Sequence, residues 1–170
     1  MASPDASVGV DVSRASFKEP EDELFGAFQT YISPHEWLWI KSFSMARDRI
    51  RAFYVIWTLK ESWVKALGDG LEFGLGRLEL LTKIVSFSSL NSDQIYQDSV
   101  GFVDGVQDSE WTFELEVLDE THVASVAHRK CDDQHLKQDS LPSESDVLQS
   151  HVFNVFTPSE FLEKINNFTI

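Results

Sequence analysis

Basic side chains gather in one part of an otherwise acidic sequence. The 170-residue chain has a net charge of −14, whereas residues 41–65 contain six basic residues and only two acidic ones. A basic segment in an acidic chain suits a polyanionic ligand, such as a nucleotide diphosphate, or an acidic surface on a partner. A helix with arginines on its solvent-exposed side would give the same pattern, and composition does not decide between the two.

Within that segment, Glu61 and Lys65 lie one helical turn apart. Residues 52–67 predict an amphipathic helix, because their apolar members recur at three- and four-residue spacing and Gly68 follows as a typical helix stop. Trp57, Glu61 and Lys65 recur every fourth residue and therefore share one face. A glutamate one turn before a lysine is also the ordinary ion pair of a solvated helix. Spacing alone favours that ordinary ion pair.

Another acidic residue, Asp11, lies far upstream in the run V-G-V-D-V, residues 8–12. Three valines alternate there with Gly9 and Asp11, which predicts a short buried strand. Taken alone, Asp11 would be expected to cap the following turn, because short apolar runs with one aspartate are common.

Together, residues 8–12 and 57–66 resemble the two signatures of the 4'-phosphopantetheinyl transferases, in the right order and at the right spacing. The first signature is an apolar-Gly-apolar-Asp-apolar run. The second has an aromatic and a small residue before K-E-S/A and a further lysine, and W-T-L-K-E-S-W-V-K-A matches it. The resemblance extends over residues 8–130 and is greatest to the animal aminoadipate-semialdehyde dehydrogenase-phosphopantetheinyl transferase group.

The resemblance implies an enzyme that moves the phosphopantetheine arm of coenzyme A onto a serine of an acyl or peptidyl carrier protein, which is holo-[acyl-carrier-protein] synthase activity. It implies a Mg²⁺ ion held by Asp11 and Glu61, since Mg²⁺ prefers hard oxygen ligands. Glu61 would also accept the serine proton. Lys65 would bind the transferring phosphate, with Lys60 and Ser62 in supporting roles at the coenzyme.

The chain departs from the family pattern in two respects. Some bacterial members have a third acidic residue at the position of Ser13, so we expect a two-carboxylate metal site completed by water. Two-lobed members also have an N-terminal half that grips the nucleotide and its 3'-phosphate, and this sequence starts almost at the first signature. We therefore expect a C-terminal lobe only: a truncated gene product, a fragment, or a chain that pairs with another copy as the short bacterial synthases do.

A missing partner lobe predicts exposed apolar surface and self-association, because monomers rarely expose large contiguous apolar patches. The strand at residues 8–12 and the hairpin around Trp111 are the expected owners of that surface. The alternative function is a non-catalytic remnant that keeps the fold and binds a carrier protein. The presence of Asp11, Glu61 and Lys65 favours the enzyme, since a remnant has no need to keep buried charges.

Composition limits the remaining classes of protein. A single cysteine, Cys131, excludes an internal disulfide and a multi-cysteine zinc site. The acidic net charge argues against nonspecific binding to nucleic acid or anionic membranes, and no apolar run is long enough to span a membrane. The first seven residues do not form a secretory signal, so we expect a cytosolic protein.

The overall pattern predicts an α+β fold, one transferase lobe over residues 8–130 with an antiparallel sheet packed against a long helix. We expect helices starting near Glu23, Pro34 and Met45, the second with a capping box. The expected strands are residues 7–12, 77–81 and 151–156, with a hairpin over 111–128 whose return strand is buried on both sides. The remaining segments are a disordered leader (1–7), a surface loop (86–99), an acidic linker (131–150) and a closing helix that completes a final unit (151–170).

Overall fold

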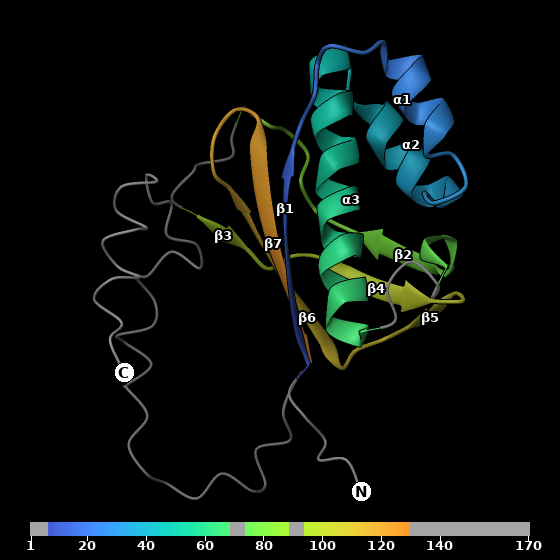
Figure 1. The fold of residues 1–170 in the computed structure, drawn as a ribbon, viewed down its shortest axis with the longest axis vertical. Coiled ribbons are helices and arrows are strands. Elements are labelled where there is room, and N and C mark those ends of the chain that lie inside the picture. Colours follow the sequence, from blue (N-terminus) through green and yellow to red (C-terminus); the bar gives the residue numbers. More distant parts are fainter. Residues whose placement is uncertain (1–6, 69–73, 89–93, 130–170) are drawn as a thin grey trace, which may run out of the picture.

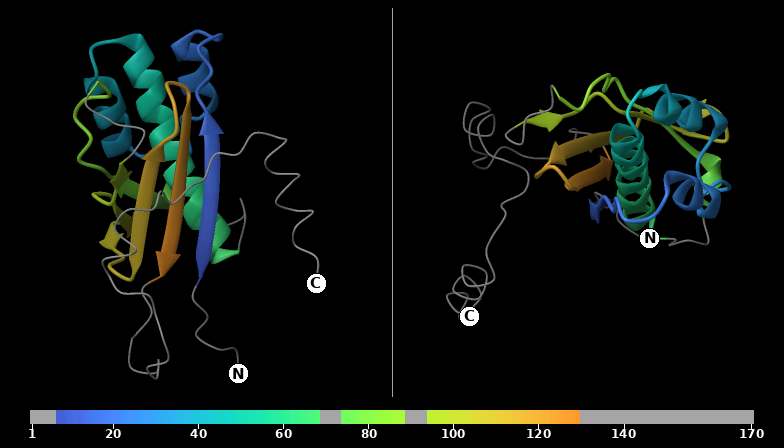
Figure 2. Two further views of the ribbon diagram at one scale, coloured as in Figure 1. Left: turned by 90° about the vertical axis from the view of Figure 1, so that its left-hand side faces the viewer. Right: turned by 90° about the horizontal axis from the view of Figure 1, so that it is seen from above.

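A computed structural model describes residues 7–68, 74–88 and 94–129 of the chain. They form an α+β fold in which the long helix α3 (Ala46–Leu67) lies between the main antiparallel sheet and two shorter helices (Figure 1). The views in Figure 2 show α3 crossing one face of this sheet, with α1 (Glu21–Ala27) and α2 (Pro34–Ser42) on the far side of α3. The predicted fold class is therefore confirmed. None of the helices in these three ranges is long and apolar enough to cross a membrane.

The main sheet has four strands in the order β1-β7-β6-β3, all antiparallel. They are β1 (Val8–Arg14), β7 (His122–Arg129), β6 (Trp111–Val117) and β3 (Ile95–Tyr96). Strands β6 and β7 form the predicted hairpin, and residues 123–127 of β7 are all buried. Strand β1 lies at one edge, with Asp11 opposite Ser125. Ser125 donates a hydrogen bond to the Thr58 carbonyl of α3, which shows that this side of the pleat faces the helix.

A smaller sheet follows α3 in the chain and has the strand order β2-β4-β5. Its strands are β2 (Leu78–Leu81), β4 (Val100–Val103) and β5 (Val106–Gln107), and a short 3-10 helix, η2 (Leu75–Arg77), precedes β2. Only β2 was predicted, and β3 lies inside the segment expected to be a loop. Strands β3 and β5 have two residues each, which is too short for a detectable alternation of apolar and polar residues, and β4 contains a glycine, which weakens the strand pattern.

Helix α3 forms and ends as its sequence predicts. Its buried stripe includes Phe53, Leu59 and Trp63, all at most 1% exposed. Gly68 adopts the left-handed conformation (φ +80°) and donates its backbone N–H to the Val64 carbonyl, an arrangement that favours glycine because other residues are strained there. At α2 the predicted capping box is present, with Ser33 and Glu36 bonding each other's backbone N–H groups.

The outward side of β1 carries an exposed apolar stripe. Val8, Val10 and Val12 are 60%, 44% and 53% exposed. Trp111, in contrast, is buried against Trp63 at a ring distance of 6.0 Å. The expectation of exposed apolar surface is thus met by β1 and is wrong for Trp111. The expectation that residues 8–12 form a buried strand is wrong for the three valines, because only the opposite side of β1 packs on α3. Residues 1–6 of the expected leader (1–7), the acidic linker and the final strand and helix lie outside the described residues.

Candidate functional site

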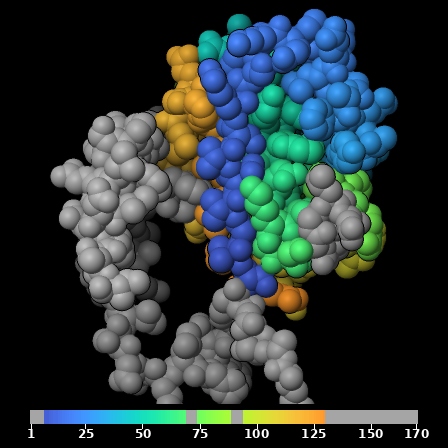
Figure 3. Space-filling model, in the orientation of Figure 1, coloured from blue at the N-terminus to red at the C-terminus, as the bar shows by residue number. Residues whose placement is uncertain are grey.

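Asp11 of β1 and Lys65 of α3 meet where the edge strand packs against the helix. Lys65 Nζ lies 2.7 Å from Asp11 Oδ1. The Asp11 side chain is 12% exposed and that of Lys65 is 50% exposed, so the carboxylate is largely covered while the ammonium group remains open to solvent. Figure 3 shows β1 and α3 side by side on this face of the molecule. The two sequence signatures are therefore in direct contact through Asp11 and Lys65, which are 54 residues apart in the chain.

The close approach of the strand to the helix depends on Gly9. A Cβ atom at this position would lie 2.1 Å from the carbonyl oxygen of Ser62 and 2.4 Å from the backbone nitrogen of Ala66, far inside contact distance. Strand β1 therefore packs directly on the backbone of α3. This packing brings Asp11, two residues further on and on the same side of the strand, within reach of Lys65.

Ser13 holds the second oxygen of the Asp11 carboxylate. Its hydroxyl donates a hydrogen bond of 2.9 Å to Asp11 Oδ2. Asp11 therefore has a partner on each oxygen, a neutral hydroxyl on one and the Lys65 ammonium on the other. Ser13 fixes the orientation of the carboxylate and supplies no third acidic group.

Glu61 lies one turn before Lys65 on the same helix and is half-buried. Its side chain makes no hydrogen bond or ion pair with any other residue of the described ranges. Burial raises the pKa of Glu61 above its ordinary value, the negative charge of Asp11 raises it further, and Lys65 opposes both effects. The two carboxylates are thus close enough to repel each other without being bonded to each other.

This arrangement suits a hard divalent cation. A half-buried carboxylate without a hydrogen-bond partner, beside a second carboxylate, provides the oxygen donors that Mg²⁺ prefers. Among residues 7–68, 74–88 and 94–129, no group of three or more His, Cys, Asp or Glu side chains converges. A metal held by Asp11 and Glu61 would therefore take its other ligands from water or from a phosphate. Glu61 also has the raised pKa of a general base, and Lys65 has a half-exposed side chain whose ammonium group can bind phosphate.

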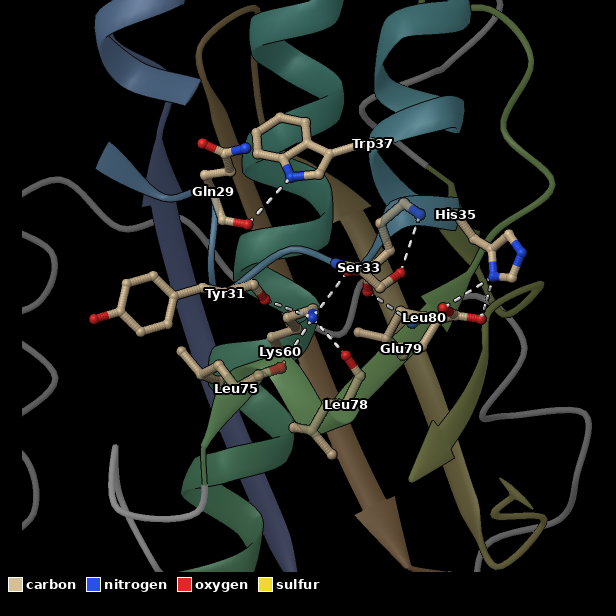
Figure 4. A network of polar contacts seen from close by, with 11 residues as sticks. Gln29, Tyr31, Ser33, His35, Trp37, Lys60, Leu75, Leu78, Glu79 and Leu80 are labelled. Atoms are coloured by element: carbon tan, nitrogen blue, oxygen red, sulfur yellow. Dashed lines mark hydrogen bonds and ion pairs between the residues drawn. The ribbon is translucent and has the colours of Figure 1, made fainter. Parts of the chain in front are cut away.

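Lys60, the other lysine of the second signature, lies on a different side of α3 and is fully buried (Figure 4). Its Nζ is 2.9 Å from Glu36 Oε2 and donates to the backbone carbonyls of Tyr31, Leu75 and Leu78. Burial lowers the pKa of Lys60, and the attraction of Glu36 opposes this shift. Contact with a coenzyme would require Lys60 to leave these four partners.

Glu36 extends the same network to two further elements. It accepts the backbone N–H of Ser33 at 2.6 Å and that of Leu80 at 2.8 Å. Burial raises the pKa of Glu36, and its ion pair with Lys60 opposes this effect. The pair therefore ties α3 to the start of α2 and to β2, and it acts as a scaffold for the helix that carries Glu61 and Lys65.

Ser62 also lies away from the contact at Asp11. Its hydroxyl is buried and donates to the Leu59 carbonyl at 2.8 Å within α3. Of the five residues expected at the site, the structure brings together Asp11, Glu61 and Lys65, and it places Lys60 and Ser62 in the interior. The roles that sequence reasoning missed are those of Gly9, Ser13 and Glu36. The capping box identified Glu36 as a helix-start residue, but no local pattern links it to Lys60.

Comparison with known proteins identifies the family of the chain. The profile of the 4'-phosphopantetheinyl transferase superfamily matches residues 7–127. The chain is 37% identical over 149 residues to the human L-aminoadipate-semialdehyde dehydrogenase-phosphopantetheinyl transferase, a match that covers 85% of this chain and 46% of the human protein. A phosphopantetheinyl transferase of Thraustochytrium sp. is 31% identical over 136 residues, covering 75% of this chain and 43% of that protein. The chain spans about half the length of the curated relatives it matches.

Proposed function

The chain belongs to the 4'-phosphopantetheinyl transferase superfamily, and we propose that it contributes the metal-binding and proton-accepting half of a site that transfers phosphopantetheine. The donor is coenzyme A and the acceptor is a serine of an acyl or peptidyl carrier protein in the cytosol. The observation that carries this proposal is the meeting of Asp11, Glu61 and Lys65 at the junction of β1 and α3.

In the proposed reaction, the serine oxygen forms a bond to the phosphorus that bears the pantetheine arm. The bond from that phosphorus to the bridging oxygen breaks, and adenosine 3',5'-bisphosphate leaves. Glu61 accepts the proton of the serine hydroxyl, directly or through water, and its raised pKa favours this role. Lys65 binds the phosphate as its charge redistributes.

Asp11 and Glu61 would hold Mg²⁺ in this site. The ion, when bound, neutralises charge on the pyrophosphate. Ser13 keeps Asp11 oriented toward α3, and the buried pair of Lys60 and Glu36 keeps the helix in place. Lys60 and Ser62 then support coenzyme binding through the position of α3.

The relatives are about twice as long as this chain, so we propose that full activity needs a second half. That half could be an N-terminal lobe or a second copy of the chain, seated on the exposed valines of β1. Apolar groups exposed on an edge strand favour such association.

The test is transfer of phosphopantetheine to an apo carrier protein, read as the intact mass of the carrier after incubation with the chain, coenzyme A and Mg²⁺. We expect trace modification by the chain alone and clear modification when the N-terminal half of a related full-length enzyme is added. The Glu61→Gln variant should stay inactive in both mixtures. Carrier binding without modification in either mixture would favour the non-catalytic remnant instead. Full activity of the chain alone would contradict the half-site proposal.

A further inference from the structure

Lys65 occupies one oxygen of the carboxylate that the proposed function assigns to the metal ion. Its Nζ lies 2.7 Å from Asp11 Oδ1, and Oδ2 accepts the hydroxyl of Ser13. Neither oxygen of Asp11 is therefore without a partner. Glu61, the second carboxylate, has no hydrogen-bond or ion-pair partner among the described residues. The two acids with Lys65 carry a net charge of −1, and the lysine compensates one of them.

We propose that Lys65 is an internal counter-ion that blocks metal binding at Asp11 until a phosphate group replaces Asp11 as the partner of the lysine. This inference rests on the proposed function, because it assumes that Asp11 is a metal ligand. A divalent ion on Asp11 Oδ1 would meet the positive charge of the ammonium already bound there, and like charges at such a distance repel strongly. The metal therefore enters when Lys65 has moved.

The structure allows this movement for the lysine and resists it for the aspartate. The Lys65 side chain is half exposed and its only ion pair or hydrogen bond within the described ranges is to Asp11, so its flexible four-carbon stem can turn toward solvent or a ligand. Asp11 is held by Ser13 and by the direct packing of β1 on α3 at Gly9. A phosphate of coenzyme A beside the site would offer Lys65 a new partner and free the oxygen of Asp11. Metal and phosphate then bind together, and metal alone binds weakly.

The experiment measures Mn²⁺ binding to the full chain without coenzyme, from the electron paramagnetic resonance signal of free Mn²⁺. Lys65→Met removes the ammonium group and keeps much of the stem. We expect this variant to bind Mn²⁺ about fivefold more tightly than the wild type, the scale of one exposed ion pair. Lys65→Arg keeps the positive charge and should bind as weakly as the wild type.

Two further variants separate this effect from others. Arg47→Met removes the same charge from an exposed ion pair of the same length, that of Arg47 with Glu120 at 2.7 Å. Arg47 lies about 27 Å from Lys65 along α3. This variant should therefore leave Mn²⁺ binding unchanged. Asp11→Asn should abolish it. If Lys65→Met binds no more tightly than the wild type while Asp11→Asn binds nothing, the metal site stands and the counter-ion role is overturned. If neither the wild type nor any variant binds Mn²⁺ more tightly than Asp11→Asn does, both the metal site and the counter-ion role are overturned.

Discussion

Lys60 and Lys65 belong to the same sequence signature and lie five residues apart on one helix, yet their surroundings are opposite. Lys60 is fully buried, with a carboxylate and three backbone carbonyls around its ammonium group. Lys65 is half exposed and is bonded to Asp11 alone among the described residues. Each partner of Lys60 belongs to the scaffold, whereas the partner of Lys65 belongs to the candidate site.

The second signature thus combines a lysine held by several buried partners with a lysine that has one partner and a half-exposed side chain. The side chain with the most partners cannot leave them without exposing buried polar groups to an apolar interior. The side chain with one partner can exchange it for a ligand. We therefore assign stability to Lys60 and chemistry to Lys65, and each of the following substitutions tests one side of this division.

The largest effect on stability should come from Lys60→Met. The substitution leaves Glu36 buried without its counter-ion, and breaking a buried pair in this way typically costs about 3–5 kcal/mol. The measurement is the free energy of unfolding in urea, with Lys65→Met as the matched control. Because the Lys65 pair is exposed on the lysine side, that control should lose less than about 1 kcal/mol.

A double variant, Glu36→Gln with Lys60→Met, checks the cause of that loss. It removes the unpaired charge and should regain part of the stability lost in the single variant. A Lys60→Met variant as stable as Lys65→Met would remove the distinction between the two lysines.

A large effect on activity, smaller than the complete loss expected for Glu61→Gln, should come from Lys65→Ala in a complemented assay that contains both halves of the site. If the lysine stabilises charge that develops during transfer, kcat should fall about 100-fold with a small change in KM. The measurement is the rate of carrier modification at saturating and limiting coenzyme A. An unchanged kcat with a raised KM would make Lys65 a ground-state anchor only.

Gly9→Ala should affect both the stability of the fold and the contact at the candidate site. The new methyl group would overlap the backbone of α3 at Ser62 and Ala66, and such overpacking costs about 1–3 kcal/mol. It should also weaken the Asp11–Lys65 contact, because β1 must move away from the helix. Gly26→Ala in α1 is the control, since nothing lies within 4 Å of its Cβ position and the change should be neutral or stabilising. Equal unfolding free energies for the two variants would contradict the packing argument.

The sequence predicted the parts of this molecule whose causes are local. Helix α3, its stop at Gly68 and the capping box at Ser33 follow from spacing and residue type within a few positions. The pairing of Asp11 with Glu61 was predicted from the resemblance of the two signatures to those of the transferase family. The contacts of Lys60 could not be predicted, because Glu36, Leu75 and Leu78 reach it from elements that meet only in the folded chain. For β1, alternation suggested a buried strand and only the expectation of a partner lobe suggested exposed valines, since alternation alone does not tell which face is covered.

The smallest effect on stability should come from Glu61→Gln, and its size depends on pH. Because burial and the charge of Asp11 raise the native pKa of Glu61, the folded chain holds this proton more tightly than the unfolded chain does. The stabilisation from that proton is complete below the unfolded value of about 4.5 and is lost as pH rises through the higher native pKa. Glutamine cannot ionise, so the stability of the variant should increase relative to the wild type as pH rises. At neutral pH the variant should be at most a few tenths of a kcal/mol more stable.

Urea denaturation at several pH values measures this difference between Glu61→Gln and the wild type. The control for loss of one acidic charge is Glu19→Gln, at a position where the glutamate side chain bonds the exposed Ser16. A wild type that is clearly more stable than Glu61→Gln at neutral pH would mean that Glu61 is a structural partner of Lys65, and the free carboxylate needed for metal binding and proton transfer would not exist.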